Sequence, residues 1–114
     1  MKKLASLCAS LLFLLSTSVF AGDHAAAALE HATQAVTHGK AGHAPVLVEH
    51  AKAALEHSLA GAIEAKGTTK THLDAASTSL QEAIDHGTLG HADVATKHAE
   101  EAVEHLKAGQ TGKK

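Results

Sequence analysis

Residues Ala35–Gly61 read AVTHGKAGHAPVLVEHAKAALEHSLAG, and residues Ala83–Gly109 read AIDHGTLGHADVATKHAEEAVEHLKAG. An offset of 48 residues aligns the two stretches without a gap, and 14 of the 27 aligned positions are identical. Self-similarity at a fixed offset indicates a repeated structural unit. We therefore interpret the chain as two copies of one helical hairpin.

Each copy is divided by a glycine-rich segment, Gly39–Gly42 in the first and Gly87–Gly90 in the second. Glycine just beyond a helix end is a common stop signal, and Pro45 is harmless near the start of the following helix. Thr71, with Asp74 three residues later, resembles a helix-capping pattern. These signals predict helices over residues 23–38, 44–65, 71–86 and 92–108, with residues 66–70 as a linker.

Apolar residues in the expected helices follow a heptad pattern. With Ala92 at position a, Leu106 also falls at a, and Leu73 and Leu80 take the same position in the preceding helix. Such a stripe faces the core of a helix bundle, and its many alanines let the helices approach closely. Short connections make consecutive helices antiparallel. The sequence thus predicts an all-α fold, an up-down-up-down antiparallel four-helix bundle built from two duplicated helical hairpins.

The first 21 residues have the pattern of a secretory signal peptide. Lys2 and Lys3 precede an uncharged apolar stretch, and Val19-Phe20-Ala21 offers small residues for cleavage after Ala21. The alternative, a retained membrane anchor, is less favoured because the stretch is short for a spanning helix. We therefore expect a periplasmic protein with a signal peptide over residues 1–21, a histidine-rich four-helix domain over 22–109 and a polar tail over 110–114.

Composition excludes several classes of function. The chain carries a formal net charge of −2, which becomes −4 when Lys2 and Lys3 are removed with the signal. The part after Ala21 has no Cys, Met, Arg or aromatic residue, so nucleic-acid binding and a thiolate copper(I) site are not expected. HExxH, ExxH and CxxCH are absent, and no Ser, His and acid grouping stands out, so we expect no enzyme and no catalytic residue.

All eleven histidines follow Ala21, and their spacing is the strongest signal in the sequence. Most are seven residues apart and all take heptad position g, so each helix carries a line of imidazoles beside its apolar stripe. The predicted metal ligands are His24, His31, His38, His43, His50, His57, His72, His86, His91, His98 and His105. Ser79 occupies the missing step between His72 and His86.

Residues seven apart on a helix are about 10.5 Å apart along its axis. Two nitrogens on one ion lie no more than about 4 Å apart, so neighbours in one line cannot share an ion. In an antiparallel hairpin, facing residues have a constant sum of residue numbers. The sums 81 and 177 pair every histidine across its hairpin, with Ser79 facing His98. Rotation of the helices could instead aim these lines at the other hairpin.

Donor chemistry narrows the choice of metal. Imidazole suits copper(II), nickel(II) and zinc(II), and affinity peaks at copper(II). Glu82 and Glu101 lie one turn from histidines and could support the coordination. We expect divalent metal ions as partners, with Cu²⁺ favoured over Ni²⁺ or Zn²⁺, no nucleic acid, no membrane after signal cleavage, and a monomer. A pH-responsive interaction protein and a metallochaperone are the alternatives.

GHADVATKHAEEAVEHLKAG (Gly90–Gly109) and AVTHGKAGHAPVLVEHAKAALEH (Ala35–His57) resemble the small metal-binding protein family. The resemblance covers nearly the whole chain after the signal and includes the heptad histidines. It implies a periplasmic, cysteine-free four-helix bundle that binds a broad range of divalent ions, favours copper, and serves copper scavenging, buffering or tolerance. Ser79 departs from the pattern and puts its pairing with His98 in doubt.

Overall fold

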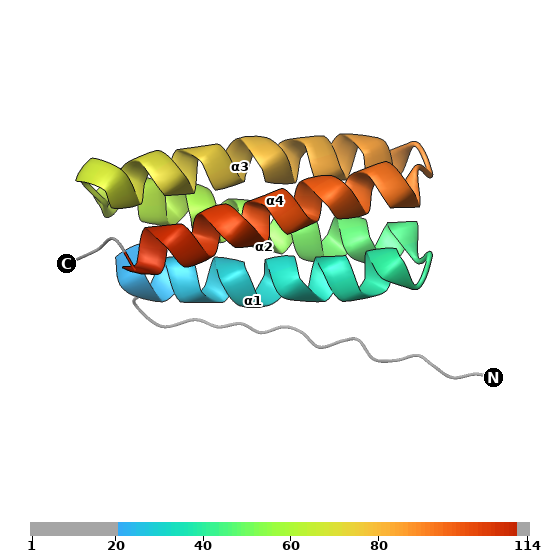
Figure 1. The fold of residues 1–114 in the computed structure, drawn as a ribbon, viewed down its shortest axis with the longest axis horizontal. Coiled ribbons are helices and arrows are strands. Elements are labelled where there is room, and N and C mark those ends of the chain that lie inside the picture. The colour runs from blue at the N-terminus through green and yellow to red at the C-terminus, as the bar shows by residue number, and fades with distance from the viewer. Residues whose placement is uncertain (1–20, 112–114) are drawn as a thin grey trace.

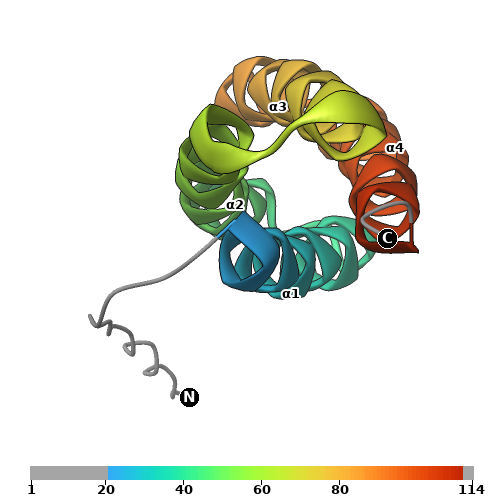
Figure 2. The same ribbon diagram turned by 90° about the vertical axis from the view of Figure 1, so that its left-hand side faces the viewer.

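Four helices form an antiparallel bundle in the computed structural model, which describes residues 21–111 (Figure 1). They are α1 (Ala21–Lys40), α2 (Ala44–Glu64), α3 (Gly67–Thr88) and α4 (Ala92–Thr111). Each helix packs against two others, α1 against α2 and α4, and α3 against α2 and α4, so the four stand at the corners of a square (Figure 2). The predicted all-α four-helix bundle is confirmed. The predicted signal peptide, except for Ala21, lies outside the described residues.

The helices extend beyond several of the ends predicted from sequence. Gly39 and Gly87 lie inside α1 and α3 rather than in turns, and α3 begins at Gly67. The prediction of a linker over residues 66–70 was wrong, because α3 already includes residues 67–70. Thr71 does not cap the helix, since its hydroxyl donates to the Gly67 carbonyl oxygen at 3.3 Å within it. A threonine can bond back to the carbonyl four residues earlier and remain helical, so it need not cap a helix.

One turn connects the two helices of each hairpin, and the two turns have the same backbone geometry. Gly42 and Gly90 have φ of 83° and 84°, a backbone conformation that glycine adopts without a steric penalty. The His43 amide donates to the His38 carbonyl at 2.9 Å, and the His91 amide donates to the His86 carbonyl at 2.9 Å. This is the hydrogen bond of a Schellman helix end. Each turn therefore joins two predicted ligands through their backbones.

The core consists mainly of alanines, with four fully buried leucines among them: Leu47, Leu73, Leu80 and Leu106. The hairpins meet at glycines, where a Cβ on Gly39 would overlap Thr96 and a Cβ on Gly87 would lie 2.6 Å from Val48 Cγ2. These two contacts are equivalent under the 48-residue offset. The two hairpins thus pack against each other through matching residues.

None of the four described helices is long and apolar enough to span a membrane.

Candidate metal centre

The eleven histidines line the grooves between the two helices of each hairpin. Nine are partly buried, while His43 and His91, at the turns, are exposed. Their position follows from the heptad pattern, because the a and d positions fill the core and position g falls at its edge. The α1–α2 pair and the α3–α4 pair lie on opposite sides of the square bundle (Figure 2).

Six imidazoles form a continuous row in the α1–α2 hairpin, which we call the first ladder. The Nδ1 atoms of His24 and His57 are 3.1 Å apart. The ring centroids of His31 and His50 are 5.8 Å apart, and those of His38 and His43 are 6.1 Å apart. These are the pairs expected from the residue-number sum of 81.

The first ladder also contains diagonal contacts that the sequence analysis missed. His31 stacks on His57 with centroids 5.9 Å apart, and His38 stacks on His50 at 5.4 Å, with 8° between the ring planes in both cases. Each inner ring therefore has a neighbour on either side. A constant residue-number sum of 88 could have revealed these pairs.

The second ladder comprises His72, His86, His91, His98 and His105, in the α3–α4 hairpin. The Nδ1 atoms of His72 and His105 are 3.5 Å apart, and the ring centroids of His86 and His91 are 6.0 Å apart. His86 also stacks on His98 at 5.5 Å. The row is interrupted at Ser79. Both ladders are formed within hairpins, so the lines do not face the other hairpin.

Glu82 and Glu101 contact His98 at the interruption. Its Nδ1 atom lies 3.1 Å from Glu82 Oε1 and 3.2 Å from Glu101 Oε1. The Ser79 hydroxyl donates to the same Glu101 oxygen at 3.5 Å. The structure thus places both predicted supporting carboxylates beside His98, the one histidine that faces a serine instead of another imidazole.

Two imidazole nitrogens in the ladders are buried without a protein hydrogen-bond partner. They are Nδ1 of His31 and Nδ1 of His86. An unsatisfied buried polar atom costs about 1–3 kcal/mol. A metal ion would supply a partner for such a lone pair, so these atoms fit a metal-binding role.

The pKa values of His50 and His57 are lowered from the ordinary 6.5. Burial is the main cause for both, and repulsion from neighbouring histidines adds to it: His31 and His38 act on His50, and His24 and His31 act on His57. Metal binding requires the neutral imidazole. The lowered pKa values therefore keep these donors available at neutral pH.

Each histidine pair supplies two donors. Within residues 21–111, no three side chains of His, Cys, Asp or Glu are already arranged as a metal site. Water would fill the remaining coordination positions, and such open sites bind several divalent ions rather than one selectively.

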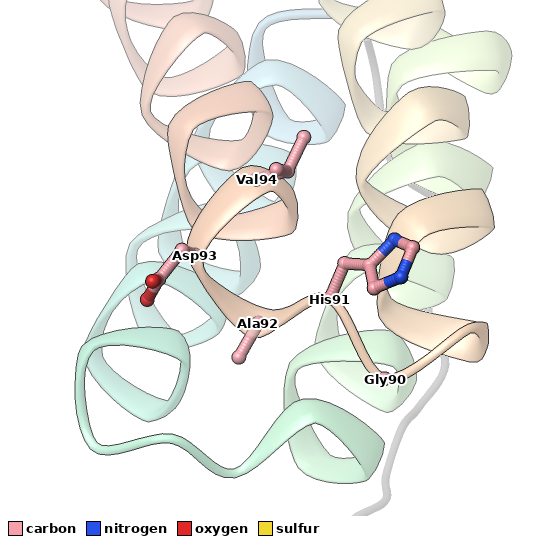
Figure 3. A pocket seen from close by; sticks show the side chains of 5 residues that line it. All are labelled: Gly90, His91, Ala92, Asp93 and Val94. Atoms are coloured by element: carbon pink, nitrogen blue, oxygen red, sulfur yellow. The ribbon is translucent and has the colours of Figure 1, made fainter.

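An open surface hollow at the α3–α4 turn offers no competing site. Gly90, His91, Ala92, Asp93 and Val94 line it. Figure 3 shows the His91 ring and the Asp93 carboxylate pointing to different sides. They are therefore not placed to bind one ion together.

Comparison with known proteins agrees with a metal-binding role. The family model described as small metal-binding protein matches residues 1–109. The chain belongs to the small metal-binding protein family. The resemblance identified from the histidine spacing is confirmed, and metal binding is the general function of this family member. No curated protein matches the chain.

Proposed function

We propose that this family member binds several divalent metal ions, preferentially copper(II), at histidine pairs across its two hairpins. It would act in the periplasm, as a buffer or scavenger that limits the free concentration of metal. The proposed ligands are the histidines of the two ladders. No reaction is assigned to the protein.

The observation that carries the proposal is the 3.1 Å separation between the Nδ1 atoms of His24 and His57. Two nitrogens about 2.0–2.1 Å from one ion, at angles of about 90° to 110°, lie about 2.8–3.4 Å apart. The Nδ1 atoms of His72 and His105, at 3.5 Å, lie just above that range. The His24–His57 pair therefore has a separation suited to chelation, and the equivalent pair of the second ladder is close to it.

The preference for copper(II) rests on ligand type. Neutral imidazoles favour copper(II) over nickel(II) and zinc(II) in the general affinity order of divalent ions. The residues after Ala21 contain no thiolate or thioether, the ligands that select copper(I). Localisation in the periplasm rests on the predicted signal peptide.

Copper titration of the protein lacking residues 1–21 tests the proposal, with bound ions counted by native mass spectrometry at pH 7 and pH 5. We expect several bound ions at pH 7, because the chain contains five facing histidine pairs, and their loss at pH 5, because protons compete for imidazole. Parallel titrations with Ni²⁺ and Zn²⁺ should give weaker binding. Binding of no more than one weak equivalent of copper would refute the proposal.

A pH-responsive interaction surface is the second candidate. The stacked pairs His31–His57 and His38–His50 favour it, because protonation of neighbouring rings places like charges side by side. This candidate predicts a change in association with pH in the absence of metal. Sedimentation of the metal-free protein at pH 7 and pH 5 distinguishes it from metal binding.

A further inference from the structure

The centre of the second ladder differs from the centre of the first at three positions that meet in space. Under the 48-residue offset, His50 corresponds to His98, and both are histidines. The other three positions have changed together: His31, Gln34 and Ala53 correspond to Ser79, Glu82 and Glu101. One imidazole is thus replaced by a small hydroxyl, and two carboxylates are added around the remaining imidazole.

Both glutamates lie close to the one imidazole of this cluster. His98 Nδ1 lies 3.1 Å from Glu82 Oε1 and 3.2 Å from Glu101 Oε1. Donors about 2.0–2.2 Å from a common ion, at angles of about 90° to 110°, are separated by about 2.8–3.6 Å. Both measured separations fall in this range. The glutamates come from α3 and α4, so the ion would bridge the two helices of the hairpin.

We propose that Glu82, His98 and Glu101 form a binding site for a harder divalent cation, of which Mn²⁺ is the representative, distinct from the histidine pairs. The inference rests on the proposed function, because it assigns a different metal class to one step of the same ladder. Carboxylate oxygens suit Mn²⁺, whereas sites made of imidazole alone favour copper(II), nickel(II) and zinc(II). The two carboxylates also neutralise the charge of a divalent ion, which a pair of neutral imidazoles cannot do.

The site forms when the ion binds. No three ligating side chains within residues 21–111 are already arranged as a metal site, so the carboxylates must turn toward a common point. The side chains of Glu82 and Glu101 are 52% and 59% exposed, which leaves them free to do so. Ser79 is small, so it leaves space beside His98, and its hydroxyl lies 3.5 Å from Glu101 Oε1.

Mn²⁺ titration followed by electron paramagnetic resonance tests the site, since the signal of the free aqueous ion falls on binding. We expect one Mn²⁺ to bind the protein, with affinity reduced about tenfold or more in the variant E82Q/E101Q. The matched control is E30Q/E64Q, which changes the net charge equally at two exposed carboxylates that form no part of this cluster. Equal loss of Mn²⁺ binding in both variants, or no loss in E82Q/E101Q, overturns the inference.

The first hairpin offers a gain-of-function test. The variant H31S/Q34E/A53E transfers the three changed residues to the equivalent positions beside His50, and a second Mn²⁺ should then bind. A folded variant that binds only one Mn²⁺ contradicts the inference. Copper binding by the unaltered protein without glutamate-dependent Mn²⁺ binding overturns this inference alone. Glutamate-dependent Mn²⁺ binding without copper binding supports this site and overturns the proposed function.

Discussion

The Nδ1 atoms of His24 and His57 lie 3.1 Å apart, although 33 residues separate them in the chain. His72 and His105, also 33 residues apart, are their equivalents in the second hairpin, with Nδ1 atoms 3.5 Å apart. Both pairs stand at the end of a hairpin away from its turn. The distance within each pair therefore depends on the pairing of the helices along their whole length.

Removal of one outer pair should remove one bound copper ion. We expect H24A/H57A to bind one Cu²⁺ fewer than the unaltered protein at pH 7, because both donors of that pair are lost, while His31 keeps His50 as its facing partner. H72A/H105A should have the same effect in the second ladder. Native mass spectrometry of the copper-saturated proteins measures the number of ions.

The control for these variants is T33A/T78A, which changes two exposed threonines outside the ladders. It should bind as many copper ions as the unaltered protein. If H24A/H57A kept the full number of ions, the outer pair would not be a site.

Introducing a histidine at position 79 should create a sixth facing pair. Ser79 is 8% exposed and its equivalent, His31, is accommodated in the first hairpin. We expect S79H to bind one additional Cu²⁺, and to bind Mn²⁺ less tightly because the new ring competes for the space beside Glu101. S79A serves as the control, since it removes the hydroxyl without adding a donor. An unchanged copper number in a folded S79H variant would show that a facing pair does not suffice for a site.

The metal-free bundle should lose stability on acidification below about pH 6.5. The folded-state pKa values of His50 and His57 are lowered, so between those values and 6.5 the unfolded chain binds more protons than the folded one. The free energy of unfolding therefore rises with pH in this window. The stabilising contribution of the two neutral histidines is fully present above pH 6.5 and is lost as the pH falls through the lowered pKa values. Urea unfolding midpoints at pH 7.5 and 5.5 measure the effect. The variant H50Q/H57Q should depend less on pH, and equal dependence would disagree with this account.

Ser58 should be replaceable by alanine with a gain in stability. Its side chain is fully buried, and its Oγ atom has no hydrogen-bond partner in the protein. Removal of an unsatisfied hydroxyl should raise the free energy of unfolding by about 1 kcal/mol, which corresponds to about 4–8 °C in melting temperature for a domain of this size. Circular dichroism melting curves of S58A measure the shift.

Ser77 provides the matched control. It is 8% exposed, but its hydroxyl donates to the Leu73 carbonyl oxygen at 2.9 Å. We expect S77A to give no gain, because the lost hydroxyl was already satisfied. A similar rise in melting temperature for both variants would mean that the missing partner of Ser58 is not the cause.

Two properties of this protein follow from its sequence alone. The seven-residue spacing and the duplicated turn at Gly42 and Gly90 suffice to predict an antiparallel bundle with facing histidines. Both are local, because a heptad assigns one helix face and a left-handed glycine reverses the chain. The register that places His24 opposite His57 follows from these two facts, but the rotation that turns the two rings toward each other does not.

Only the tertiary structure decided how the ladders are oriented and connected. The close approaches of Gly39 to Thr96 and of Gly87 to Val48 join residues far apart in the chain. In the packed bundle the imidazoles meet within their own hairpins, rings stack diagonally in the first ladder, and two carboxylates reach His98. Spacing assigns a residue to a helix face, but packing between distant segments determines what that face meets.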